Sequence, residues 1–120
     1  METTKRVHLR RTARADLADI WNYGAEEWGT AQADRYARNL SALFRTLAEM
    51  PGIGREHVEF EPPVRIHPSG PHLVIYRATT DGIEVLRIMG ALQNWRAALR
   101  LGDLDHPSKL LHHNHDLQAL

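Results

Sequence analysis

Cysteine is absent from the 120-residue sequence, which excludes disulfide bonds, thiolate metal ligands and cysteine nucleophiles. Long apolar runs are missing as well, since no stretch approaches the roughly 20 apolar residues that a membrane-spanning helix needs. The opening segment METTKRVHLRR lacks the apolar stretch of a secretory signal. We therefore expect a cytoplasmic protein that makes no direct membrane contact.

Lysine is scarce: only Lys5 and Lys109 among the fifteen basic residues are lysines. The formal net charge is zero, but residues 1–12 and 65–100 are basic whereas residues 13–61 are acidic. The basic segments coincide with expected strands and the acidic one with expected helices. A basic sheet beside an acidic layer attracts an anionic partner, and arginine binds phosphate or carboxylate through its forked guanidinium.

The sequence otherwise has the composition of one folded domain, with 25% charged and 42% hydrophobic residues. A chain of this length is long enough for one domain and too short for two of ordinary size. We expect a single domain over residues 1–100. Residues 101–120 lack clean periodicity and are expected to form a C-terminal tail.

The N-terminal part predicts a strand followed by a helix. Alternating apolar residues in RVHLRR, residues 6–11, indicate a strand with one buried face. Thr12 is then the expected N-cap, with Asp16 near the helix start to suit the helix dipole. Apolar residues follow at helical spacing and place Trp21 and Trp28 on the buried stripe.

A second helix follows directly. Gly29 ends the first helix, and residues 30–50 carry the clearest apolar stripe in the sequence. Tyr36 and Phe44 lie on this stripe and are interpreted as packing residues. Pro51 cannot continue the helix. Because the connection is so short, the two helices are predicted to form an antiparallel hairpin.

The remaining segments predict a sheet. Residues 51–63 are rich in glycine and proline and indicate a loop. Strands are expected at 64–67, 72–78 and 83–89, the last two so apolar that they should be central. A short helix is expected within 94–101. The predicted fold class is therefore α+β: an N-terminal strand, an antiparallel helical hairpin on one face of the sheet, and a three-stranded antiparallel meander.

Five short segments, taken in order, carry a family resemblance. The first helix contains ADLADIWNY (15–23), and PGIGR (51–55) follows the second helix. VR (64–65), HLVIYR (72–77) and DGIEVLRI (81–88) lie in the expected meander. Together they resemble the opening helix motif and the final meander of the ParE branch of the RelE/ParE toxin family of bacterial toxin–antitoxin systems.

This resemblance covers about residues 6–92 and implies the RelE/ParE-like fold. It also implies a toxin encoded beside an antitoxin that wraps and neutralises it in a hetero-oligomer. ParE-like members are implicated in blocking DNA gyrase, and RelE-like members in cutting mRNA on the ribosome. No cofactor is implied by either branch.

The ribonuclease alternative needs a general base, a general acid and cations for the phosphate charge. Its candidate catalytic residues here are Arg65, His67, His72 and Tyr76. The loop before the meander is acidic, and the segment after the last strand lacks the basic and aromatic residues usual in RelE-like toxins. The sequence therefore favours a non-enzymatic activity while leaving RNA cleavage open.

The candidates for binding a target are basic or aromatic. Arg65, Arg77 and Arg87 lie on three successive expected strands, where they either form one basic patch or pair individually with acidic neighbours. Trp95 and Arg96 are candidates because Trp and Arg are enriched at binding hot spots, although Trp95 also suits packing of the last helix over the sheet. No residue is assigned to antitoxin binding.

Two features bear on potency and on metal binding. Met89 occupies a place where many ParE-like chains have a histidine, and the charged continuation after the following glycine is absent. His106 and the HHNH segment, residues 112–115, have no scaffold for a zinc site, so no metal is expected.

The sequence thus predicts the toxin of a type II toxin–antitoxin system that inhibits DNA gyrase and is neutralised by a cognate antitoxin. One alternative is a RelE-like, metal-independent mRNA endoribonuclease. A second alternative is a non-toxic protein that binds the antitoxin and acts as a co-repressor partner.

Overall fold

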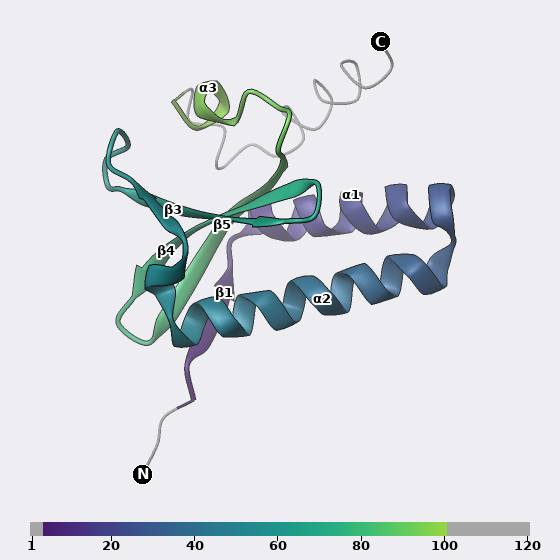
Figure 1. The fold of residues 1–120 in the computed structure, drawn as a ribbon, viewed down its shortest axis with the longest axis horizontal. Helices are drawn as coiled ribbons and strands as arrows, with labels where there is room; N and C mark the ends of the chain where they lie inside the picture. Colours follow the sequence, from purple (N-terminus) through teal and green to yellow (C-terminus); the bar gives the residue numbers. More distant parts are fainter. Residues whose placement is uncertain (1–3, 101–120) are drawn as a thin grey trace.

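The computed structural model describes residues 4–100, so the expected tail lies outside the described residues. Two helices follow the first strand, and the sheet is completed after them (Figure 1). In chain order the elements are β1 (Arg6–Leu9), α1 (Arg11–Trp28), α2 (Thr30–Glu49), the 3₁₀ turn η1 (Pro51–Ile53), β2 (Arg55–His57), β3 (Val64–Ser69), β4 (His72–Thr79), β5 (Gly82–Gly90) and α3 (Trp95–Arg100).

The sheet has five strands in the order β1-β5-β4-β3-β2. β1 pairs in parallel with β5, and every other neighbouring pair is antiparallel. The predicted α+β class and the central position of β4 and β5 are confirmed. β2 was not expected, because it is a three-residue edge strand within the segment interpreted as a loop.

The helical hairpin covers one face of the sheet, as predicted, and this side is called the hairpin face (Figure 1). Leu40, Phe44 and Leu47 of α2 are buried there against β4 and β5. Burial of each such side chain contributes about 1.5–3 kcal/mol. This packing ties the clearest apolar stripe of the sequence to the centre of the sheet.

A second buried cluster lies on the other side of the sheet, called the open face. It contains Phe60 from the β2–β3 loop and Leu99 from α3, packed with Val64, Leu86 and Met89 of the strands. The short helix expected near residues 94–101 is therefore present and covers part of this face. None of the helices within residues 4–100 is both long and apolar enough to cross a membrane.

Two local predictions were wrong at the ends of α1. The helix begins at Arg11, so Thr12 lies inside its first turn and is not the N-cap. Trp28 was expected in the core, but its side chain is 61% exposed. Gly29 does end the helix, with a φ of 96° that L side chains rarely adopt.

Candidate interaction surfaces

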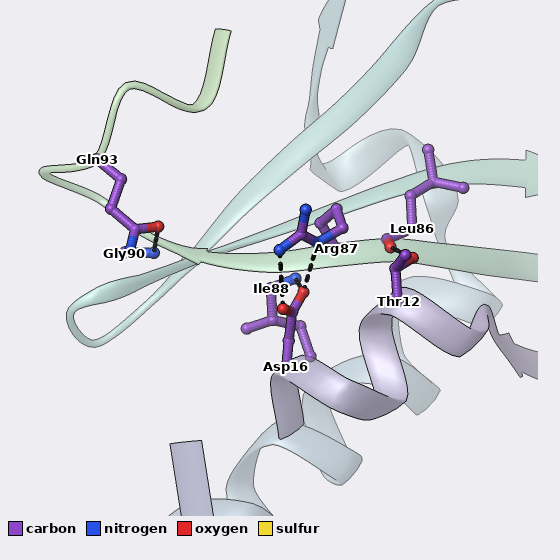
Figure 2. A network of polar contacts seen from close by, with 7 residues as sticks. All are labelled: Thr12, Asp16, Leu86, Arg87, Ile88, Gly90 and Gln93. Carbon is purple, nitrogen blue, oxygen red and sulfur yellow. Dashed lines mark hydrogen bonds and ion pairs between the residues drawn. The ribbon is translucent and has the colours of Figure 1, made fainter. Parts of the chain in front are cut away.

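The first turns of α1 lie along the edge of β5, beyond the point where its pairing with β1 ends. β1 pairs with β5 only as far as Val85, and the chain then turns into the helix. Beyond this point the Thr12 hydroxyl donates to the Leu86 carbonyl at 2.7 Å, and the Ile88 N–H donates to the Asp16 carboxylate at 2.9 Å (Figure 2). These side chains satisfy backbone groups that would otherwise be unpaired at a buried strand edge.

A buried ion pair lies in the same junction. The Arg87 guanidinium donates from Nε and Nη2 to the two Asp16 oxygens at 2.7 and 2.9 Å, and both side chains are 1% exposed. Burial raises the pKa of Asp16, while the hydrogen bonds and charge of Arg87 act in the opposite direction. Of the two alternatives for Arg87, an exposed basic patch is therefore wrong, because this guanidinium is buried and paired with Asp16.

Tyr76 holds the loop that follows α2. Its buried hydroxyl donates to the Pro51 carbonyl at 2.6 Å and accepts the Gly54 N–H at 2.9 Å. Arg65, the cross-strand neighbour of Tyr76, donates to the Gly54 carbonyl at 2.8 Å. Burial raises the pKa of Tyr76, so its hydroxyl stays protonated as a donor. Arg65 and Tyr76 are therefore both hydrogen-bonded to the backbone of this loop.

Tyr36 fastens the β3–β4 turn to α2. Its hydroxyl lies 2.7 Å from the Ser69 carbonyl and 2.8 Å from Nδ1 of His72. A carbonyl only accepts, so the single hydroxyl proton goes to Ser69 and His72 donates from a protonated Nδ1. Burial lowers the pKa of His72, which favours the neutral ring with a lone pair on Nε2.

This environment predicts a pH dependence of stability. Because the folded-state pKa of His72 is below the unfolded value of about 6.5, the unfolded chain binds the extra proton first. The stability contribution is therefore complete at higher pH and is lost as the pH falls through 6.5 toward the folded-state pKa. His72→Asn, whose amide N–H substitutes for Nδ1–H, removes this titration.

We expect the advantage in melting temperature of the wild type over His72→Asn to be larger at pH 7.5 than at pH 5.5. Thermal unfolding followed by circular dichroism at both pH values measures this difference. An equal difference at the two pH values would contradict the assignment of the buried neutral ring.

Charged side chains form a row across the open face. His8, Glu84 and Arg77 are successive cross-strand neighbours on β1, β5 and β4. Arg10 donates to Glu84 at 3.3 and 3.4 Å, while Arg77 donates to the carbonyls of residues 62 and 63. Burial, followed by the charge of Arg10, lowers the pKa of Arg77, while the charge of Glu84 acts in the opposite direction. Beside the row is an open hollow of about 410 Å³, lined by Arg6, Val7, His8, Thr79, Asp81 and Glu84.

α3 is attached to the β2–β3 loop by stacked and charged groups. The Trp95 ring packs against His57 and Phe60, with ring centroids 5.3 and 6.1 Å apart. The Arg96 guanidinium stacks 4.4 Å from the Trp95 ring and donates to Glu59 at 3.2 Å. The Glu59 backbone N–H, followed by His57 and Arg96, lowers the pKa of Glu59 to about 2. Trp95 and Arg96 therefore contact each other, and both are held in place by residues of the β2–β3 segment.

The four ribonuclease candidates, Arg65, His67, His72 and Tyr76, lie on the hairpin face but at different positions along β3 and β4. Arg65 and Tyr76 meet at the loop, whereas His72 lies at the opposite end of β4, about 13 Å away at 3.3 Å per strand residue. The remaining candidate, His67, contacts the carbonyl of Pro68 through Nδ1. Of the four candidates, Arg65 and Tyr76 are both hydrogen-bonded to the loop backbone at Gly54, whereas His72 is hydrogen-bonded to Tyr36.

The three strand arginines do not form one patch. Arg65 lies on the hairpin face, Arg77 on the open face and Arg87 in the buried junction. Trp95 and Arg96 lie on the same side of the sheet as Arg77. Met89 is buried on that side with 2% exposure, so this side chain is part of the core.

Two residues of structural importance were missed in the sequence. The sequence pattern assigned no tertiary contact to either Asp16, interpreted through the helix dipole, or Gly54, interpreted as a loop residue. The available signal for Asp16 was an acidic residue one turn after the helix start, on the same side as Ala13. For Gly54 the signal was the pair of glycines between Pro51 and Arg55.

A family model described as the ParE toxin of the type II toxin–antitoxin system parDE matches residues 7–95. Among curated proteins, the chain is 40% identical to Toxin ParE1 of Caulobacter vibrioides over 95 residues, which are 79% of this chain and 98% of the relative. It is 36% identical to Toxin ParE1 of Mycobacterium tuberculosis over 87 residues, covering 72% and 89% of the two chains.

A solved structure titled "Chromosomal ParDE TA system from P. aeruginosa" contains a chain of similar fold. The TM-score is 0.61 at 21% sequence identity, covering 72% of this chain and 96% of that chain. At this identity the likeness concerns the fold, which agrees with the α+β architecture described above.

Proposed function

Because this chain belongs to the ParE toxin family of type II toxin–antitoxin systems, we propose that it inhibits DNA gyrase and that a cognate antitoxin neutralises it. The observation that carries this proposal is the 40% identity to a ParE toxin, which extends over 98% of that toxin's length. The family name alone gives no target, so gyrase is the part that needs a direct test.

We place the target contact on the open face, at Arg77, Trp95 and Arg96. Arg96 is exposed and stacks on Trp95, and the contacts with Glu59 and His57 hold both side chains in place. Ordered Trp and Arg side chains contribute disproportionately to protein interfaces, because little conformational entropy is lost on binding. Arg87 is not part of this proposed contact, since its guanidinium is buried.

A DNA supercoiling assay tests the target. Purified gyrase and relaxed plasmid are incubated with the full chain, in the presence and absence of its antitoxin. We expect loss of supercoiling that the antitoxin reverses. Normal supercoiling in the presence of well-folded protein would contradict the proposal and favour RNA cleavage or a non-toxic role.

The same assay tests the contact surface. Arg96→Ala is expected to raise the half-inhibitory concentration about tenfold, equivalent to about 1.4 kcal/mol of binding. The matched control is Arg45→Ala, which removes an exposed arginine from α2. Equal potency of the two variants would place the contact elsewhere while leaving gyrase as the target.

A further inference from the structure

Two large aromatic side chains are exposed near the turn between α1 and α2. Tyr23 is 49% exposed and Trp28 is 61% exposed, and their rings meet edge to face with centroids 5.8 Å apart. Neither residue belongs to the two buried clusters. Trp28 is the last residue of α1, and the turn between α1 and α2 lies well beyond the strands (Figure 1). Packing of the described fold therefore does not account for this aromatic pair.

The backbone beneath this pair is well ordered by local contacts. Gly24 is buried where the two helices approach, and a Cβ atom added there would lie 3.6 Å from Cβ of Ala33. Across the same interface, Trp21 Nε1 donates to the Asp34 carboxylate at 2.8 Å. The aromatic pair is thus presented by α1, which is joined to α2 through packing and a hydrogen bond, and binding would order little new structure.

Acidic residues predominate in the chain on both sides of the α1–α2 turn, and Arg35 is the first basic residue that follows them. Residues 17–34 contain four carboxylates and no lysine or arginine. Glu26 and Glu27 are exposed beside Trp28, and within residues 4–100 neither forms an ion pair. We call this surface the hairpin tip; it comprises Trp21, Tyr23, Glu26, Glu27, Trp28 and Asp34.

We propose that the hairpin tip docks a basic segment of a partner protein that also carries an apolar side chain. Arginine or lysine would pair with Glu26 and Glu27, and a cation next to an indole or phenol ring gains further attraction. An apolar side chain would cover Trp28. Charge complementarity selects this occupant over an acidic segment, which the three carboxylates of the hairpin tip would repel. The inference is independent of gyrase and of the open-face contact.

The test uses the full chain and two labelled helical peptides of fourteen residues. One peptide has a leucine face and an arginine face, and in the other every arginine is replaced by glutamate. Fluorescence anisotropy measures binding to the wild type and to two tip variants, Tyr23→Ala/Trp28→Ala and Glu26→Gln/Glu27→Gln. We expect the wild type to bind the arginine peptide, and each tip variant to bind it about tenfold more weakly.

Matched controls remove similar groups elsewhere. Glu49→Gln removes an exposed carboxylate at the other end of α2, and Met50→Ala removes an exposed apolar side chain beside it. Both controls should bind like the wild type. Equal binding by tip variants and wild type, or equal binding of the glutamate peptide, would overturn the proposal. A change of oligomeric state in the tip variants alone, measured by sedimentation, would instead identify a second copy as the occupant and also overturn it.

Discussion

Replacing Arg87 by methionine should lower the free energy of unfolding by about 3–5 kcal/mol, because it leaves the Asp16 carboxylate buried without its charged partner. Both side chains are 1% exposed, so water cannot replace the lost hydrogen bonds. Burial already raises the pKa of Asp16, and without the guanidinium this pKa should rise further. Chemical denaturation at pH 7 measures the loss.

A double variant separates the buried charge from the loss of packing. In Asp16→Asn/Arg87→Met the charge is gone, while the asparagine oxygen still accepts the Ile88 N–H. This variant should regain most of the stability, since an uncharged replacement of a buried pair is often nearly neutral.

The control for a surface ion pair is Arg96→Met, which should cost less than about 1 kcal/mol because Arg96 and Glu59 are solvent-exposed. If Arg87→Met were as mild as this control, the Asp16–Arg87 pair would not be essential to the junction of α1 and β5.

Periodicity predicted the large elements because their apolar faces are buried in the way the pattern requires. The stripe on α2 and the apolar runs of β4 and β5 meet in one cluster. β2 escaped prediction because three residues are too few to show alternation, and their segment is rich in glycine and proline. The prediction for Trp28 was wrong because the hairpin extends past the sheet (Figure 1). The apolar stripe of α1 therefore has no strand to pack against near Gly29, and Trp28 is exposed.

The position of Arg87 depended on a feature that one sequence does not reveal. The pairing of β4 with β5 shifts register next to Ile75, so that Ile75 faces Arg87 whereas Tyr76 faces Val85. This irregularity leaves Leu86 without a partner in the ladder and breaks the simple alternation of faces along β5. Simple alternation cannot then be used to group Arg87 with the other strand arginines. Only the tertiary contact with Asp16 shows that Arg87 is buried at the junction of α1 and β5.

The loop held by Tyr76 gives the second large effect. Gly54→Ala is expected to destabilise the protein by about 2–4 kcal/mol, from overpacking together with the loss of buried hydrogen bonds. An added Cβ would overlap the Tyr76 hydroxyl and approach two of its ring atoms at 2.8 Å. Tyr76 cannot move aside easily, because it is fully buried and its hydroxyl is bonded to the carbonyl of Pro51.

Gly52→Ala is the matched control, since it adds the same methyl group two residues earlier in the same loop. An added Cβ at Gly52 has no neighbour within 4 Å, and we expect a change within about 0.5 kcal/mol. Thermal and denaturant unfolding of the two variants give the comparison directly. Equal stability of Gly54→Ala and Gly52→Ala would mean that the loop moves freely from Tyr76, and that Arg65 and Tyr76 are not bound to a fixed backbone. A large loss confined to Gly54 would instead show that the Tyr76 side chain is held by the loop, which leaves its hydroxyl engaged there and not free for acid–base chemistry on RNA.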